Sequence, residues 1–183
     1  LVEMNNLPSS FRDPSGFLFR KNEVLYRQVN NCYRRNYDHL LNSGFYDQST
    51  KAGILVPHVE LPVTDFSVNE NAYKIIRPNE LPFVSYPYEW SFSQLQDAAL
   101  FTLDLQKRAL SVGLSLKDAS AYNVQFYRGR PIFIDTLSFE MREKDTPWFA
   151  YNQFCKHFFA PLVLMSLTDA ELGKLSQVWI DGI

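Results

Sequence analysis

One stretch of the sequence, Leu116–Glu140, places three polar residues at defined positions around two apolar β-type runs. The two runs flank a turn-like segment, 128–131, that contains Gly and Pro, and this order is typical of a β-hairpin. Asn123 precedes the first run and Asp135 follows the second, so antiparallel pairing brings them together, with the loop of Asp118 alongside. Two carboxylates and a carboxamide can hold a divalent cation and leave one acid free to orient a hydroxyl group.

The composition indicates a folded chain with a substantial core. The 183 residues are 46% hydrophobic and 15% aromatic, which suffices for one sizeable domain or two small lobes. The net charge of -2 argues against a nucleic-acid partner, because nucleic-acid-binding domains carry a basic patch. No apolar run reaches the ~20 residues that span a bilayer, and no signal-peptide pattern is present, so we expect a soluble protein with no membrane partner.

The two cysteines, Cys32 and Cys155, lie far apart in the sequence and have no C-x-x-C spacing. A disulfide framework or a zinc site is therefore not expected, and a cytoplasmic localisation is the default. The chain begins at Leu1 instead of Met and ends without a polar tail, which is consistent with a piece of a longer protein.

Strand-like runs separated by turns fill the first ninety residues and predict a small, mostly antiparallel sheet with one helix. We predict one β-hairpin over residues 17–29 and a second over residues 73–88. The helix between them is predicted to be capped by Asn30 or Asn31 and to stop at Gly44.

Helical periodicity dominates the second half of the chain. A capping box that begins at Ser93 opens the clearest predicted helix, which stops at Gly113. The aromatic segment Pro147–Met165 is predicted to be helical, with a kink or an end at Pro161, and Thr168 is predicted to cap a last helix.

These patterns divide the chain into an arm over residues 1–13, a small β-rich lobe over residues 14–88 and a helical lobe over residues 89–183. The helical lobe contains the hairpin described first. The predicted fold class is therefore α+β, with an antiparallel-sheet lobe followed by a mostly helical lobe.

This order of parts resembles the protein-kinase-like fold, which aminoglycoside phosphotransferases share. Residues 117–123 resemble the catalytic loop of that superfamily, D-x-x-x-x-N, and Asp135 resembles the metal-binding Asp that follows the next hairpin. The resemblance covers residues 14–140. It implies that Asp118 orients or deprotonates the acceptor, whereas Asn123 and Asp135 hold Mg²⁺ against the phosphates of ATP.

Departures from the kinase pattern leave a catalytically inactive pseudokinase open as an alternative. Leu116 and Lys117 stand where a His commonly precedes the catalytic Asp, and Thr136 follows Asp135 in place of Phe or Gly. No glycine-rich phosphate loop is present, because the segment before the first hairpin contains one glycine, Gly16. Nucleotide binding is therefore expected to be atypical.

A nucleotide would also need a cation on a strand to hold its phosphates. Arg27 is the first candidate and Lys74 the second, although Arg differs from Lys in geometry. Asp38 is the candidate acidic partner on the first helix, and Glu89 with Trp90 could frame an adenine pocket at the connector. Structural alternatives are an exposed cross-strand charge for the arginine and an aromatic packed linker for the connector.

Asp118 and Asn123 also have a structural alternative, because Asp and Asn favour turns and caps, where they form local hydrogen bonds. Their spacing alone does not decide between a catalytic loop and an ordinary turn. The presence of Asp135 at the far end of the hairpin favours a functional cluster.

Four longer runs are similar to the N-terminal region of bacterial S-adenosylmethionine-dependent methyltransferases, some of them nodulation-related: YPYEWSFSQLQDAAL, LKDASAYNVQF, PIFIDTLSFE and PWFAYNQFCKHFFAPL. This resemblance spans most of residues 14–183 and implies a methyltransferase domain on the C-terminal side. No GxGxG-type loop follows a strand here, so S-adenosylmethionine is not expected to bind this chain.

Two functions of different classes follow. The first is a kinase-like phosphotransferase domain that binds ATP, Mg²⁺ and a small-molecule acceptor. The second is a non-catalytic accessory or regulatory module, which would expose an apolar patch after Pro147 where the methyltransferase domain docks. The acceptor and the oligomeric state are not specified by the sequence.

Overall fold

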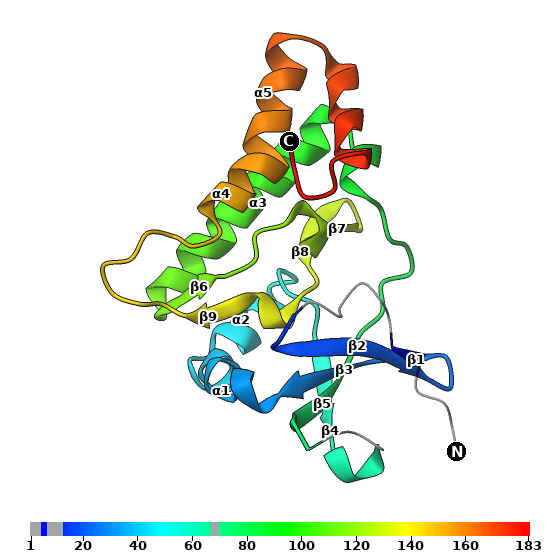
Figure 1. The fold of residues 1–183 in the computed structure, drawn as a ribbon, viewed down its shortest axis with the longest axis vertical. Helices are drawn as coiled ribbons and strands as arrows, with labels where there is room; N and C mark the ends of the chain where they lie inside the picture. Colours follow the sequence, from blue (N-terminus) through cyan, green and yellow to red (C-terminus); the bar gives the residue numbers. More distant parts are fainter. Residues whose placement is uncertain (1–4, 7–12, 67–69) are drawn as a thin grey trace.

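The computed structural model describes residues 5–6, 13–66 and 70–183, which form a sheet-containing small lobe and a helical lobe (Figure 1). The small lobe has one antiparallel sheet of strand order β1-β2-β3-β5-β4, made of β1 (Asn5–Asn6), β2 (Gly16–Lys21), β3 (Val24–Asn30), β4 (His58–Leu61) and β5 (Ala72–Pro78). The expected α+β class is confirmed, because an antiparallel-sheet lobe comes first and a mostly helical lobe with a β-hairpin follows. Most of the predicted arm lies outside the described residues.

Local turn chemistry forms the first hairpin, between β2 and β3. Its turn residues Asn22 and Glu23 have φ angles of 52° and 64°, as a two-residue type I′ turn requires. Gly16 opens β2 because a Cβ atom there would lie 2.0 Å from the carbonyl oxygen of Gln28 in β3. The hairpin predicted over residues 17–29 is confirmed, and the glycine before it serves close strand packing.

The second predicted hairpin, over residues 73–88, is wrong. β5 pairs with β3 on one side and with β4 on the other. Residues 81–86 instead form an extended connector, which ends in a 3₁₀ turn, η4 (Pro87–Glu89). The true partner was missed because β4 has only four residues, none of them fully buried, and such a segment carries little hydrophobic pattern.

The helical part of the small lobe is larger than predicted. A 3₁₀ turn, η2 (Asn31–Tyr33), leads into α1 (Arg34–Asn42), and a short unpredicted helix, α2 (Phe45–Lys51), follows. Neither predicted cap residue caps α1: Asn30 donates a hydrogen bond to the carbonyl of Pro14 (2.9 Å) and Asn31 to that of Glu70 (3.2 Å). Gly44 stops α1 as predicted, with a φ angle of 76°.

The longest helix, α3 (Phe92–Ser111), runs along the helical lobe (Figure 1). Its capping box is formed by Ser91 and Gln94: the Ser91 Oγ accepts from the Gln94 amide (3.3 Å), and the Gln94 Oε1 accepts from the Ser91 amide (3.0 Å). The box therefore begins two residues before the predicted one at Ser93. The buried face of α3 comprises Leu95, Ala98, Ala99, Thr102, Leu105, Gln106 and Ala109.

Two further strand pairs follow α3: β6 (Leu114–Leu116) with β9 (Phe139–Met141), and β7 (Val124–Tyr127) with β8 (Arg130–Phe133). The β7–β8 turn consists of Arg128 and Gly129, with φ angles of 52° and 76°, so this is again a type I′ turn. The hairpin predicted first from the sequence is confirmed.

The β7–β8 hairpin is hydrogen-bonded to the small lobe. Phe133 accepts a backbone hydrogen bond from Val56 (2.9 Å) and donates one to Ile54 (2.8 Å). Leu40 and Phe45 from the small lobe pack in the same apolar cluster as the buried residues of α3 and of this hairpin. The two lobes therefore share one core.

The C-terminal helices lie beside α3 (Figure 1). α4 (Tyr151–Phe154), a π-helical turn, η7 (Cys155–Phe159), and α5 (Ala160–Leu167) follow one another without interruption. Pro161 has no amide hydrogen and lies in the first turn of α5, directly after the π turn, where the missing donor is tolerated. A 3₁₀ segment, η8 (Ala170–Gln177), completes the lobe and is capped by Asp169, not by the predicted Thr168.

The position of the α3 capping box yields a stability prediction. Replacing Ser91 by Ala removes the acceptor of the Gln94 amide and is expected to destabilise the protein by about 1 kcal/mol. The matched control is Ser93→Ala, at an exposed position inside the helix, which is expected to be neutral or slightly stabilising. Urea unfolding of both variants measures the difference, and equal effects would contradict the assignment.

Candidate functional site

The β7–β8 hairpin brings Asn123 and Asp135 to one end. Asn123 closes a 3₁₀ turn, η5 (Ala121–Asn123), and its carbonyl accepts a hydrogen bond from the amide of Ile134 (2.9 Å), which extends the strand ladder by one pair. Asp135 then caps another 3₁₀ turn, η6 (Thr136–Ser138). The Asn123 side chain donates to the hydroxyl of Ser138 (3.2 Å), so its orientation is fixed.

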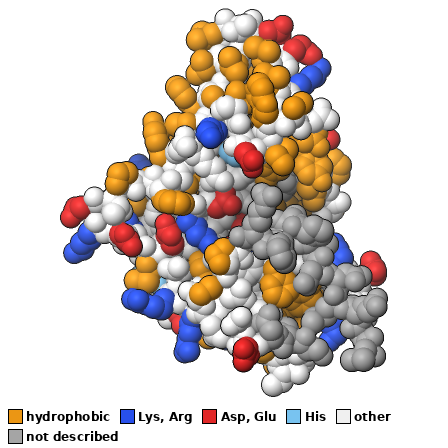
Figure 2. All heavy atoms as spheres, viewed as in Figure 1, with side chains coloured by type: hydrophobic (Ala, Val, Ile, Leu, Met, Phe, Trp, Pro, Cys, Tyr) orange, Lys and Arg blue, Asp and Glu red, His pale blue; other side chains and the backbone are white. Residues whose placement is uncertain are grey.

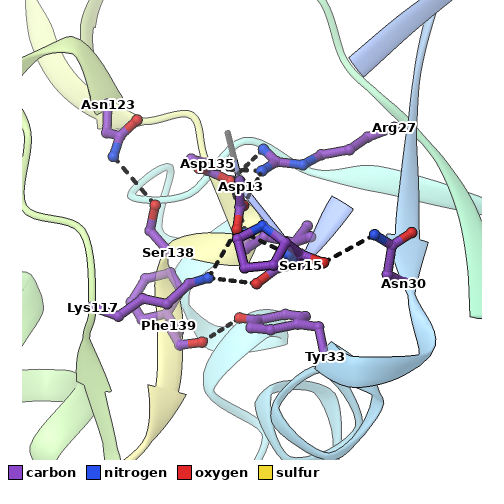
Figure 3. Close-up of polar contacts among 12 residues, drawn as sticks. Asp13, Ser15, Arg27, Asn30, Tyr33, Lys117, Asn123, Asp135, Ser138 and Phe139 are labelled. Atoms are coloured by element: carbon purple, nitrogen blue, oxygen red, sulfur yellow. Dashed lines mark hydrogen bonds and ion pairs between the residues drawn. The ribbon is translucent and has the colours of Figure 1, made fainter. Parts of the chain in front are cut away.

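Arg27, from the centre of the sheet, forms an ion pair with Asp135 (Figure 3). Its Nη1 donates to Asp135 Oδ1 at 2.5 Å, and its Nη2 lies 3.4 Å from Oδ2. Asp135 Oδ1 also accepts from the amide of Leu137 (2.8 Å). The side chains of Arg27 and Asp135 are only 10% and 17% exposed, so this charge pair joins the two lobes in a largely dry environment.

Asp13 and Lys117 extend the pair into a network of four charges (Figure 3). Asp13 Oδ2 accepts from Arg27 Nη2 (3.1 Å), and its Oδ1 accepts from Lys117 Nζ (3.3 Å) and from the amide of Ser15 (2.9 Å). Lys117 Nζ also donates to the Ser15 hydroxyl (2.5 Å). Cations and carboxylates alternate along this network from Asp135 to Lys117.

The network shifts the pKa values of its neighbours. Burial alone would raise the pKa of Asp13, but the Ser15 amide and the positive charges of Lys117 and Arg27 outweigh it and lower the pKa. Tyr33 donates a hydrogen bond to the carbonyl of Phe139, and burial raises its pKa well above the ordinary value. Asp13 is therefore a carboxylate and Tyr33 a neutral phenol at neutral pH.

A cleft of about 910 Å³ opens between the sheet and the helical lobe beside this network. Arg27, Lys117, Asp118, Asn123 and Asp135 all line it. Apolar side chains line it as well, and they come from both lobes: Leu18, Leu25, Val56, Ile76, Leu81, Val84, Ile134 and Leu137. The volume lies within the ~300–1,000 Å³ that is usual for ligand sites.

Asp118 lines the cleft outside the charge network. Its Oδ1 accepts a hydrogen bond from the amide of Ser120 (2.9 Å), and the amide of Ala119 is bound by Gln153 Oε1 from α4 (2.8 Å). Among the described residues, none donates a hydrogen bond to the second carboxylate oxygen of Asp118. The loop is thus held by its own Ser120 amide and by Gln153, while one oxygen of Asp118 accepts no hydrogen bond from a described residue.

Three predicted residues lie away from this cluster. Lys74 pairs with Glu60 (2.7 Å) on the sheet, and Glu89 accepts from the amide of Tyr86 (2.7 Å) in the η4 capping box. Asp38 accepts from the hydroxyl of Tyr73 (2.6 Å) and pairs with Arg34, not with Arg27. None of the three lines the cleft.

Sequence reasoning missed three residues of the site, Asp13, Ser15 and Lys117. Asp13 and Ser15 precede the first hairpin in an unremarkable turn-like segment, and Lys117 was noted only for not being His. The charge of Lys117 directly before Asp118 was the available signal. Contacts across 104 residues, between Lys117 and Asp13, have no local pattern that could predict them.

The described residues of the cleft offer oxygen ligands for a magnesium ion, but they do not supply a complete coordination shell. Within residues 5–6, 13–66 and 70–183, no group of three or more His, Cys, Asp or Glu side chains could hold a metal ion. The carboxylate of Asp135 and the amide oxygen of Asn123 are nevertheless suitable Mg²⁺ ligands. They fit an ion that arrives with phosphate oxygens and keeps several waters.

Comparison with known proteins places the chain near a nodulation protein. No family model matches it. Nodulation protein NoeA of Rhizobium meliloti (strain 1021) is 35% identical over 161 residues, which are 87% of this chain and 33% of NoeA. The chain therefore spans about a third of the length of this relative, and the expected likeness to nodulation-related proteins is supported. The likeness to methyltransferases stays a prediction.

A solved structure of vaccinia related kinase 3 also aligns with the chain. The alignment covers 98% of this chain and 71% of that protein, with a TM-score of 0.47 and 10% sequence identity. In addition, no helix among the described residues is long and apolar enough to cross a membrane.

The forked contact of Arg27 leads to a stability prediction. Arg27→Lys keeps the charge but cannot donate to Asp13 and Asp135 with a planar fork, so we expect a loss of about 1.5–3 kcal/mol. Arg20→Lys in the neighbouring strand is the matched control, because its pair with Glu80 is exposed and is expected to be worth at most about 1 kcal/mol. Urea unfolding measures both, and an equal loss would contradict the role of the fork.

Proposed function

We propose that the cleft binds a nucleoside triphosphate with Mg²⁺, as a kinase-like phosphotransferase domain that acts on a small-molecule acceptor. The observation that carries the proposal is the convergence of Arg27, Asn123 and Asp135 beside one cleft. Their positions agree with the roles that the kinase resemblance implies, a cation for phosphates and oxygen ligands for the metal.

The base of the nucleotide has a suitable place at the connector. The carboxamide of Gln125 holds Ser85 from both sides: its Oε1 accepts from the Ser85 amide (2.8 Å), and its Nε2 donates to the Ser85 carbonyl (3.0 Å). The backbones of Phe83 and Val84 form no hydrogen bond with another described residue. A stretch anchored at Ser85, whose amide and carbonyl groups at 83–84 no described residue binds, lies next to apolar side chains and suits a planar heteroaromatic ring. This subsite replaces the one predicted at Glu89.

The polar residues of the cleft indicate where the phosphates and the acceptor would bind. Arg27 and Lys117 supply positive charge for phosphate oxygens. Mg²⁺ held by Asn123 and Asp135 would neutralise further negative charge on the phosphates. Asp118, with one carboxylate oxygen available, is suited to orient an acceptor hydroxyl. Asn152 and Lys156 line the cleft on the side of Asp118 and offer polar contacts to the acceptor.

Thermal unfolding with ligands tests the proposal. MgATP is expected to raise the Tm, whereas Mg²⁺ alone and S-adenosylmethionine are expected to leave it unchanged. Arg27→Met is expected to abolish the shift caused by MgATP. Lys74→Met is the matched control, because Lys74 is a cation of the same sheet that lies outside the cleft. Absence of any shift for the wild-type protein, even in a large excess of MgATP, would refute nucleotide binding.

A second candidate function is that of an accessory module in a longer protein. Exposed apolar side chains gather over the upper part of the helical lobe, as Figure 2 shows. The exposed apolar residues of this lobe include Leu100, Phe159, Leu167 and Trp179, which are 61%, 60%, 81% and 51% exposed. A surface of this kind favours a docked partner, and a C-terminal methyltransferase domain is the candidate.

Hydroxyl-radical footprinting tests the accessory role. In a longer form of the protein, of the length of its relative, Phe159 and Trp179 are expected to be labelled several-fold less than in the isolated region, because the docked domain covers them. Phe83, which is 70% exposed on the connector, is the internal control and is expected to be labelled equally. Equal labelling of all three residues would contradict docking at this surface.

A further inference from the structure

The carboxylate of Asp13 lies where three donors converge, as Figure 3 shows. Its Oδ1 accepts from the Ser15 amide (2.9 Å) and from Lys117 Nζ (3.3 Å), and its Oδ2 accepts from Arg27 Nη2 (3.1 Å). Two cations and a backbone amide are the donors with which proteins bind phosphate groups. Asp13 thus fills a position that is built for an anion.

The donors are held in place by groups other than Asp13. Arg27 is fixed by Asp135, which accepts from its Nη1 at 2.5 Å. Lys117 donates to the Ser15 hydroxyl at 2.5 Å. Removing the Asp13 carboxylate would therefore leave the donors in position, so that the anion site persists without its internal occupant.

One donor of the site has no partner among the described residues. The Nε atom of Arg27 is buried and forms no hydrogen bond within the described part of the chain. Leaving such a donor unsatisfied costs free energy, and a ligand that accepts from it recovers that cost. A phosphate group has more acceptor oxygens than a carboxylate and can engage more of the donors at once.

The charge balance favours the same class of ligand. Arg27 and Lys117 carry two positive charges, and Asp13 and Asp135 carry two negative ones, so the network is neutral as it stands. Without the Asp13 carboxylate, one positive charge would remain uncompensated beside the cleft that these side chains line. That charge would attract an anion.

We propose that Asp13 is an internal competitor for phosphate, which occupies the phosphate-binding position formed by Arg27, Lys117 and Ser15. A phosphate group of the ligand and the Asp13 carboxylate then exclude each other, and binding requires Asp13 to withdraw. Asp13 thereby lowers the affinity of the cleft for its ligand. The inference rests on the proposed function in so far as the competing group belongs to the nucleotide.

The variant Asp13→Asn tests the competition, because it keeps the size of the side chain and removes its charge. Binding of inorganic triphosphate and of MgATP is measured by calorimetry for the wild-type protein and the variant. The variant is expected to bind inorganic triphosphate about tenfold more tightly or better, because the competitor no longer reduces the binding-competent fraction. In the double variant Asp13→Asn/Lys117→Met, this gain is expected to be lost.

The outcomes separate the two proposals. Tighter triphosphate binding by Asp13→Asn without MgATP binding by either protein supports the competitor and refutes nucleotide binding. MgATP binding with equal affinities in both proteins leaves the nucleotide proposal intact and overturns the competitor. Weaker binding of MgATP by the variant would assign Asp13 to the metal instead, and this result also overturns the competitor.

A folding control covers the case in which Asp13→Asn is unstable, because the variant leaves Arg27 and Lys117 with one carboxylate fewer. Thermal unfolding is then followed with and without inorganic triphosphate. Recovery of the wild-type Tm by the anion supports the competitor, since the anion takes the position of the lost carboxylate. Failure of the anion to raise the Tm overturns it.

Discussion

The ion pair between Arg27 and Asp135 is the interaction on which the cleft depends. It joins the centre of the sheet to the end of a hairpin 108 residues away. A largely buried pair adds little net stability, because both charges leave water, but it strongly disfavours any arrangement that separates them. The apolar core that both lobes share supplies most of the folding free energy, and the ion pair determines how sheet and hairpin face each other.

Features with local causes could be predicted from the sequence. Both hairpins were predicted because a polar turn segment, 20–23 or 128–131, separates two apolar runs. The stop of α1 was predicted because Gly favours the left-handed conformation that ends a helix, and Gly44 has a φ angle of 76°. Features that depend on distant partners could not. The short strand β4 has a place in the sheet only because β5 lies next to it, and no pattern in its own four residues indicates this.

The candidate site also has a part with local causes and a part that depends on distant residues. The spacing of Asp118, Asn123 and Asp135 predicted a cluster, since a hairpin of known length brings its ends together. The residues that surround the cluster come from elsewhere in the chain, and choosing among the cations of the sheet required the register of its strands. Arg27 points to Asp135, whereas Lys74 on the neighbouring strand is bound by Glu60.

The arginine at position 27 and the aspartate at position 13 are matched to each other. A lysine at position 27 would place a single ammonium group between two carboxylates, whereas the arginine fork donates to Asp135 with Nη1 and to Asp13 with Nη2. The arginine is therefore matched to two acidic residues, one in the segment before the first hairpin and one at the end of the β7–β8 hairpin. Gly16, which follows this acidic segment, is required by the close approach of the Gln28 carbonyl. Arginine on the strand and aspartate before it therefore form one pair, and with Lys117 and Asp135 they leave the four-charge network beside the cleft neutral.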